Sequence, residues 1–332
     1  MNRRELVVGA AAGALALGSG GLAEVLRRRS TFGYDGLEVL GSNVQAITPN
    51  DDFYVVTKNL IDPRVNAGSW RLELSGLVEK PRTLDLAEVE SMPAVEQATT
   101  LECISNAVGR GLISNAVWTG VPLGTLLLQV VPKSSARRVF LHAADGYTHS
   151  MPINKAFEQT TLLALAMNGE SLPDRHGFPA RLIVPGAYGE VSVKWIDRIE
   201  LVDDDRKGYY EKQGWQAQRA HTMSRIDVPA KGSTVSGPVE VRGIAFAGDR
   251  GISKVEVSTD GGRSWRDAEI GYHPTRLTWA LWSFAWRGAA SGEHELVVRA
   301  TDRTGELQSA VAESSVPDGA TGLHRVRVRV EA

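Results

Sequence analysis

The segment from Arg325 to Val330 reads Arg-Val-Arg-Val-Arg-Val, and this strict alternation restricts the fold more than any other feature of the chain. Successive side chains of a strand point to opposite faces, so the valines would face a core and the arginines the other side. Asp260-Gly261 is typical of a hairpin turn. Other strand-like segments precede Arg325 without any helical pattern, at 238–247, 255–265 and 296–300. We therefore predict an all-β sandwich over residues 220–332.

A charged run at 203–208, Asp-Asp-Asp-Arg-Lys-Gly, separates this sandwich from a first domain with a different pattern. Strand-like segments in the first domain mix with two short helical ones, without a regular strand–helix–strand period. We therefore predict an α+β domain over residues 45–205. The predicted strands are 70–76, 139–141 and 181–185, and the predicted helices are 84–92 and 122–131.

The N-terminus has the layout of an export signal. Arg3-Arg4 precedes a mildly apolar stretch from Leu6 to Leu17, which is shorter than the about 20 residues that span a membrane. Paired arginines are typical of the twin-arginine export route. An uncleaved anchor or a basic tail is the alternative. We expect residues 1–26 to be an export signal or membrane anchor, and the protein to be exported to the periplasm or cell surface.

Charge and cysteine content limit the possible functions. The 37 basic and 39 acidic residues leave a net charge of −2, which provides no basic stripe for nucleic acid. Cys103 is the only cysteine, so an intrachain disulfide cannot form. A single thiol in an exported protein is either a buried small side chain or is bonded to something.

A polar cluster interrupts the apolar strands of the first domain. It comprises Asp174 to Arg181 and Ser192 to Trp195. Arg181 begins an apolar run, and a cation there is costly unless it meets an anion. With Lys194 it would bind a phosphate, or alternatively it pairs with Asp174 at a strand end. No dinucleotide-binding, phosphate-loop, zinc-protease or serine-hydrolase motif is present.

Several blocks in this order resemble the sulfite oxidase family of molybdopterin-dependent oxidoreductases, in its bacterial, exported form. The blocks are 100–106 (Thr-Leu-Glu-Cys-Ile-Ser-Asn), 118–123, 167–173, 174–181 and 193–195. The similarity covers roughly residues 48–331. It implies a molybdopterin domain followed by an immunoglobulin-like sandwich that serves as the dimerisation domain.

The resemblance also implies roles for individual residues. Cys103 would bind molybdenum beside the dithiolene sulfurs of one Mo-molybdopterin, which suits a soft thiolate. Asp145 would face the site as a further catalytic residue. The residues expected to hold the cofactor are Asp51, Tyr54, Cys103, Asp145, His176, Arg181, Ser192, Val193 and Lys194.

The chain departs from the family pattern around the substrate. Where the family has Asn-Arg-Arg after the cysteine, this chain has Asn106-Ala107-Val108, and Arg110 is the nearest cation and a catalytic candidate. Leu165 or its neighbour Ala166 stands at the place of a tyrosine, and Val56, Thr57 and Lys58 replace a segment with an arginine. Sulfite needs convergent cationic donors, so we expect poor sulfite oxidation.

The predicted activity is oxygen-atom transfer on a small-molecule substrate. No Cys-x-x-Cys-His haem attachment is present, so electrons would pass to or from an external partner. We also expect a homodimer. Two alternatives are a reductase of S-oxides or N-oxides with the same fold, and a non-catalytic cell-surface binding protein.

Overall fold

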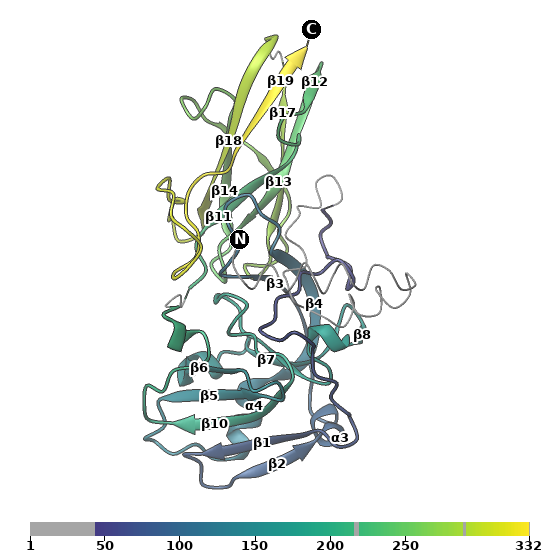
Figure 1. Ribbon diagram of the computed structural model, residues 1–332, viewed down its shortest axis with the longest axis vertical. Helices are drawn as coiled ribbons and strands as arrows, with labels where there is room; N and C mark the ends of the chain where they lie inside the picture. The colour runs from purple at the N-terminus through teal and green to yellow at the C-terminus, as the bar shows by residue number, and fades with distance from the viewer. Residues whose placement is uncertain (1–43, 216–218, 288–289, 332) are drawn as a thin grey trace.

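The computed structural model describes residues 44–215, 219–287 and 290–331. The predicted export segment, residues 1–26, lies outside the described residues. The two predicted domains lie end to end along the long axis, with the sandwich at one end and the first domain at the other (Figure 1). Among the described residues, no helix is long and apolar enough to cross a membrane.

One sheet of the first domain has five strands in the order β2-β1-β10-β5-β6. The only parallel neighbours in it are β1 and β10, and the Trp70 indole donates to the Ile196 carbonyl at 2.9 Å beside them. Apolar side chains of β1 alternate into the core, as predicted. The strands are β1 (Arg71–Gly76), β2 (Arg82–Asp85), β5 (Arg138–Ala143), β6 (Thr148–Pro152) and β10 (Ile196–Val202).

A second sheet of this domain carries residues of the pocket that is described below. Its order is β3-β4-β7-β8, and β9 pairs with β7. β3 ends immediately before Cys103, and β9 begins at Arg181, which lies opposite Ala164 in the ladder. The strands are β3 (Val95–Glu102), β4 (Ile113–Pro122), β7 (Leu162–Met167), β8 (Glu170–Ser171) and β9 (Arg181–Ile183).

The helices of the first domain are short. α3 (Leu86–Glu90) begins with a capping box between Asp85 and Glu88, and α4 (Leu123–Gln129) follows Pro122. Both lie within predicted helical segments; α5 (Ile153–Ala156) has four residues, and η2 (Asp174–His176) and η3 (Glu211–Gln213) are single 3-10 turns. The α+β prediction is therefore confirmed in part: strands and short helices are both present, but the described chain is mostly β, because its helices end after one or two turns.

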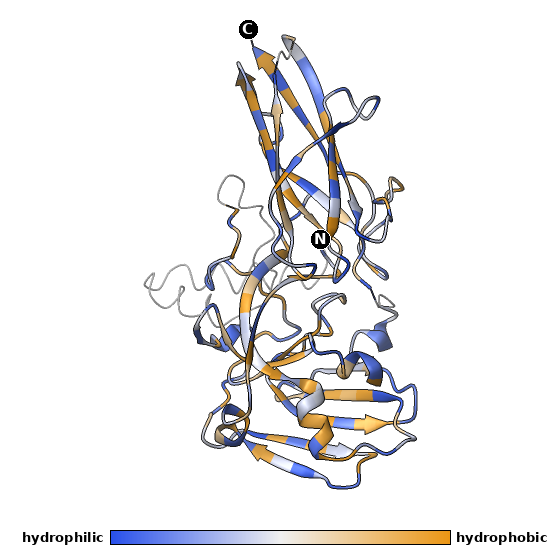
Figure 2. Ribbon diagram, turned by 180° about the vertical axis from the view of Figure 1, so that it is seen from behind, coloured by the Kyte–Doolittle hydropathy of each residue, from blue (hydrophilic) through white to orange (hydrophobic). Residues whose placement is uncertain are grey.

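The C-terminal domain is a sandwich of two sheets over one core. Val326, Val328 and Val330 of β19 are buried, and the arginines between them are exposed, as the alternation predicts. Figure 2 shows this alternation along the strands. One sheet contains β11 (Met223–Val228), β13 (Val239–Phe246), β17 (Ala280–Trp286) and β16 (Glu269–Tyr272); the other contains β12 (Thr234–Ser236), β19 (Arg325–Glu331), β18 (Gly292–Asp302), β14 (Ile252–Ser258) and β15 (Arg266–Asp267).

The arginines of β19 form ion pairs across the outer face of the sandwich. Arg325 and Arg327 lie 2.9 and 3.2 Å from the Glu295 carboxylate on β18, and Arg329 lies 3.4 Å from Glu293. Exposed pairs of this kind contribute about 0–1 kcal/mol each. The positive charges of the β19 arginines are therefore balanced by carboxylates of the same chain.

The two domains share a core. Ile104 and Ile113 of the first domain pack in one cluster with Phe246 and Trp279 of the sandwich. The Thr100 amide donates to the Leu277 carbonyl at 3.0 Å, and the Trp279 amide donates to the Thr100 hydroxyl at 2.8 Å. The strand that leads to Cys103 is thus hydrogen-bonded to the sandwich.

Candidate active site

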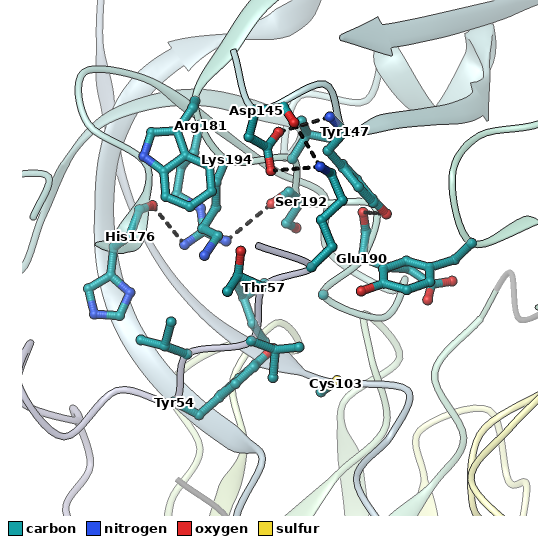
Figure 3. A pocket seen from close by; sticks show the side chains of 18 of the residues that line it. Tyr54, Thr57, Cys103, Asp145, Tyr147, His176, Arg181, Glu190, Ser192 and Lys194 are labelled. Atoms are coloured by element: carbon teal, nitrogen blue, oxygen red, sulfur yellow. Dashed lines mark hydrogen bonds and ion pairs between the residues drawn. The ribbon is translucent and has the colours of Figure 1, made fainter. Parts of the chain in front are cut away.

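A pocket opens in the first domain where the ends of β3 and β9 meet the loops beside them (Figure 3). Cys103 and Arg181, far apart in sequence, both line it. Its lining residues are Phe53, Tyr54, Val55, Val56, Thr57, Lys58, Leu101, Cys103, Asp145, Tyr147, His176, Arg181, Gly189, Glu190, Ser192, Val193, Lys194, Trp195, Tyr210 and Trp215. The pocket thus unites most residues that the sequence singled out.

Cys103 is held rigidly in the loop after β3. Its amide donates to the Leu112 carbonyl at 2.9 Å, and its carbonyl accepts from the Asn106 amide at 2.9 Å. The Asn106 side chain donates to Glu102 at 2.9 Å and accepts from the Leu112 amide at 3.0 Å. This explains the asparagine three residues after the cysteine: it fixes the loop that presents the thiol.

Cys103 is buried, with an exposed fraction of 7% for the whole residue. Burial raises its pKa to about 12, and hydrogen bonds from Ser105 oppose this shift. A thiol with such a pKa is a poor nucleophile by itself, and it loses its proton when a metal ion binds. The environment therefore favours a ligand role over a free reactive thiolate.

Arg181 is buried against the pocket, with an exposed fraction of 5%. Its guanidinium donates to the carbonyls of His176 and Ser192 at 3.0 and 3.2 Å and lies 5.0 Å from the Trp118 ring. The Nε atom of Arg181 has no hydrogen-bond partner. The Arg181 side chain forms no ion pair in the part of the chain that the structure describes. The alternative pairing with Asp174 is therefore wrong, and the cation is left for an external anion.

Lys194 is a second cation at the same wall and is partly buried. Its ammonium donates to the Arg175 carbonyl at 3.0 Å and lies 4.3 Å from the Trp195 ring. Burial lowers its pKa to about 7, while Asp62 opposes the shift. A bound phosphate would restore its positive charge.

His176 lies beside these cations. Its Nε2–H donates to the Asn50 carbonyl at 3.0 Å, and its ring meets Phe53 edge-on at 5.4 Å. Burial, followed by the Arg181 charge, lowers its pKa to about 3. The imidazole is therefore neutral, and its other nitrogen is left as an acceptor.

Asp145 lies in the turn between β5 and β6 and is held in a polar network. It accepts from the Asn59 amide at 2.6 Å and from the Tyr147 backbone at 2.9 Å. The Lys58 ammonium donates to its carbonyl at 2.7 Å and lies 3.8 Å from its carboxylate. The charge of Lys58 is thus largely compensated.

The remaining predicted residues of the pocket have mainly structural contacts. The Ser192 hydroxyl accepts from the Val184 amide at 3.1 Å, and the Leu182 amide donates to the Val193 carbonyl at 2.8 Å. Tyr54 packs against Gly189: a Cβ atom added to this glycine would lie 2.5 Å from the Tyr54 hydroxyl oxygen. These contacts place the 189–194 loop against the pocket.

Two predicted residues and two departures do not reach the pocket. Asp51 and Arg110 are exposed, and neither lines it. Arg110 instead presents its carbonyl to Arg225, at 2.7 Å. Val108 is 37% exposed, and Leu165 packs against the main core of the first domain. The catalytic role given to Arg110 thus has no geometric support.

The pocket also contains residues that sequence reasoning did not select. They include Tyr147, Glu190, Tyr210 and Trp215, together with Val56, Thr57 and Lys58, which were noted only as departures. Glu190 lies two residues before Ser192, so the block containing Lys194 was the available signal. The aromatic residues come from loops that no motif marks.

The residues fit an anionic cofactor that brings its own metal ligands. Buried Arg181 and partly buried Lys194 form no ion pair with a carboxylate among the described residues, and they lie in one pocket with a protonated thiol. Among the described residues, no group of three His, Cys, Asp or Glu side chains is arranged to hold a metal ion. A metal in this pocket therefore needs ligands from the cofactor besides Cys103, and a pterin dithiolene with a phosphate supplies both.

Two family models match consecutive parts of the chain. Residues 59–210 match the oxidoreductase molybdopterin binding domain, and residues 213–331 match the Mo-co oxidoreductase dimerisation domain. The protein is thus a molybdopterin-dependent oxidoreductase with a Mo-molybdopterin cofactor.

Comparison with similar proteins indicates the same family. Sulfite oxidase of Arabidopsis thaliana is 29% identical over 81% of this chain and 84% of its own, and sulfite oxidase of Gallus gallus is 31% identical over 79% and 68%. The structure of the sulfane dehydrogenase SoxCD of Paracoccus pantotrophus superposes with a TM-score of 0.75 at 25% identity, covering 88% of this chain and 85% of that one. The reaction class is oxygen-atom transfer with an external electron partner. The chain belongs to the sulfite oxidase family of molybdenum-dependent oxidoreductases.

Proposed function

We propose that Cys103 binds the molybdenum and that the wall formed by His176, Arg181 and Lys194 holds the pterin and its phosphate. The absence of a carboxylate partner for buried Arg181 among the described residues carries this proposal. Two cations on one anion form charge-assisted hydrogen bonds that neutral donors do not match. Ser192 and Val193 would place backbone and hydroxyl groups against the pterin, and Tyr54 would close its inner side.

The bound cofactor supplies the oxygen-atom transfer and the exchange of electrons. The protein's own groups orient the substrate and handle protons. Asp145 would hold Lys58 at the pocket wall, so that a small substrate meets an ammonium already paired with an acid. Asp51 and Arg110 have no part in this arrangement, because neither lines the pocket.

The substrate would be a small molecule with less negative charge than sulfite. Of the cations that line the pocket, Arg181 and Lys194 serve the cofactor, and Lys58 is compensated by Asp145. Reduction of an S-oxide or N-oxide is the second candidate for the same reason. The non-catalytic alternative is set aside, since the chain has the oxidoreductase domain.

Metal and cofactor analysis of the purified protein tests this proposal. About one molybdenum and one pterin per chain are expected. Protein purified from molybdenum-replete cells without either would contradict it. A panel of sulfite, sulfides, S-oxides and N-oxides, with a dye as electron partner, then gives the direction of turnover.

The proposal extends to assembly and location. The sandwich would be immunoglobulin-like and would mediate a homodimer, as its match to a dimerisation domain suggests. Residues 1–26 would direct export by the twin-arginine route, or anchor the protein in the membrane, so that the enzyme works in the periplasm or at the cell surface. Fractionation of cells with and without Arg3→Lys and Arg4→Lys tests export.

A further inference from the structure

A second, larger cavity of about 590 Å³ adjoins the active-site pocket. It lies between β6, α5 and the 184–191 loop, and Asp249 of the sandwich closes one side. In the described part of the chain, Glu190 and Trp215 are the only residues that line both spaces. These two side chains therefore form the partition between the pocket and the second cavity.

Glu190 is an unusual group in this position. Its Oε2 atom is buried without a hydrogen-bond partner, and within the described ranges it forms no ion pair. Asp145, the only other carboxyl group lining the pocket in those ranges, is fully engaged with Asn59, Lys58 and the Tyr147 backbone. Glu190 is thus the free carboxyl group of the pocket, and Figure 3 shows it beside Tyr147.

The second cavity has room and polar groups for water. Its volume exceeds many times the about 30 Å³ that one water occupies in the liquid. His149 lines it with a buried Nδ1 that lacks a hydrogen-bond partner in the described chain, and burial lowers the pKa of His149 to about 4, so its ring is neutral. Glu211 lines the same cavity.

Turnover in the pocket must move protons. Oxidation of a substrate X follows X + H₂O → XO + 2H⁺ + 2e⁻, with the electrons leaving singly to the external partner, and the reverse reduction consumes two protons. Among the lining groups, Arg181 and Lys194 are committed to the cofactor under the proposed function. The pocket therefore needs another group that exchanges protons with water.

We propose that Glu190 transfers protons between the active-site pocket and the water of the second cavity. In each step the carboxylate accepts a proton on the pocket side and releases it to water on the cavity side, so that Glu190 is unchanged and two protons pass per turnover. This inference rests on the proposed function of the pocket.

The electrostatic surroundings of Glu190 support this role. Burial, followed by the Glu211 carboxylate, raises its pKa to about 8, so both protonation states are accessible near neutral pH. The Tyr147 hydroxyl donates to the backbone carbonyl of Glu190 at 3.0 Å. The charged and titratable groups that line the two spaces with it are Tyr54, Lys58, Cys103, Asp145, Tyr147, His176, Arg181, Lys194 and Tyr210 on the pocket side, and Arg138, His149, Lys155, Glu158, Lys207, Glu211, Arg219 and Asp249 on the cavity side.

Glu190→Gln in the full chain tests the inference, because glutamine keeps the shape and cannot carry the proton. We expect normal molybdenum and pterin content, turnover lowered about 100-fold, a changed pH profile, and recovery with added small weak acids. Glu190→Asp should retain part of the turnover. Glu240→Gln makes the same Glu-to-Gln change at an exposed site of the sandwich and should behave as wild type.

An infrared pH titration gives a readout that does not need turnover. In cofactor-free protein, the carboxyl band that titrates near pH 8 should vanish in Glu190→Gln. Wild-type turnover with an unchanged pH profile in that variant overturns the inference. So does lost cofactor in the glutamine variant, because Glu190 then has a structural role. Absence of molybdenum from the wild-type protein would instead contradict the proposed function and leave the infrared result to stand by itself.

Discussion

Arg181 and Lys194 pack on the same side of Gly177, whose missing Cβ would lie 3.1 and 3.0 Å from the Cβ atoms of these two residues. Gly177 also has a φ of 111°, a conformation that side chains disfavour. The chain thus uses a glycine to bring a buried and a partly buried cation together. Such a pair is costly without an anion, and this is the basis for the first two predictions.

Replacing either cation should reduce cofactor content. Arg181→Ala and Lys194→Ala each remove charge-assisted hydrogen bonds worth about 1.5–3 kcal/mol, so pterin affinity should fall by about 10- to 100-fold. Pterin released from purified variants measures this. Arg137→Ala, an exposed arginine of the same domain, is the matched control. Normal occupancy in both pocket variants would refute the phosphate role.

Cofactor binding should weaken as the pH rises above about 7. Burial lowers the pKa of Lys194 to about 7 in the cofactor-free protein, so the amine is neutral above that pH and must take up a proton to meet the phosphate. Pterin retention at pH 6 and pH 9 checks this. Lys194→Arg keeps its charge and should flatten the dependence; the same slope in that variant would assign the effect to another group.

Cys103→Ser should lose molybdenum and activity but keep the fold. A serine hydroxyl is a harder and weaker ligand than a thiolate, while it fills nearly the same volume. Metal content, turnover and thermal unfolding of the variant measure the two effects separately. Full turnover with serine would show that Cys103 is not the ligand.

The protein should be a homodimer in solution. The match of residues 213–331 to a dimerisation domain supports this, whereas the β19 arginines are balanced by Glu293 and Glu295 within one chain. Light scattering should give about twice the 35.9 kDa of the chain. A monomer across the accessible concentration range would rule the dimer out.

Sulfite should be a poor substrate. A dianion needs fixed cationic donors, and each one missing at a transition state costs about 2–4 kcal/mol, or about 30- to 1000-fold in rate. The apolar departures Val108 and Leu165 do not line the pocket, so the argument depends on Lys58 being compensated by Asp145. Steady-state turnover of sulfite beside S-oxides and N-oxides decides it. Efficient sulfite turnover would refute the expectation.

Local patterns explain what the sequence predicted well. The alternation in β19 and the capping residue Asp85 of α3 act within a few residues, so their structure follows from their neighbours. Cys103, Arg181 and Lys194 came from short blocks of sequence, and all three line one pocket.

Long-range contacts explain what the sequence missed. Lys58 contacts Asp145, which lies 87 residues further along the chain. Glu190 lies beside a cavity that several separate segments line together, so no single stretch of sequence reveals its surroundings. Arg110 was selected because it is near Cys103 in sequence, yet the loop turns it outward to the surface. Nearness along the chain is a weak guide to nearness in a pocket.

The hydrogen bonds between Thr100 and the 277–279 segment have a consequence for engineering by recombination. These bonds use backbone atoms of Leu277 and Trp279, whereas the Trp279 side chain packs in one cluster with Ile104 and Ile113. A chimera that joins this first domain to the sandwich of a relative without that tryptophan would leave a gap in this cluster. The misfit would lie beside Ile104, the residue after Cys103. The two domains therefore depend on each other's junction residues, and grafting either one requires carrying those residues with it.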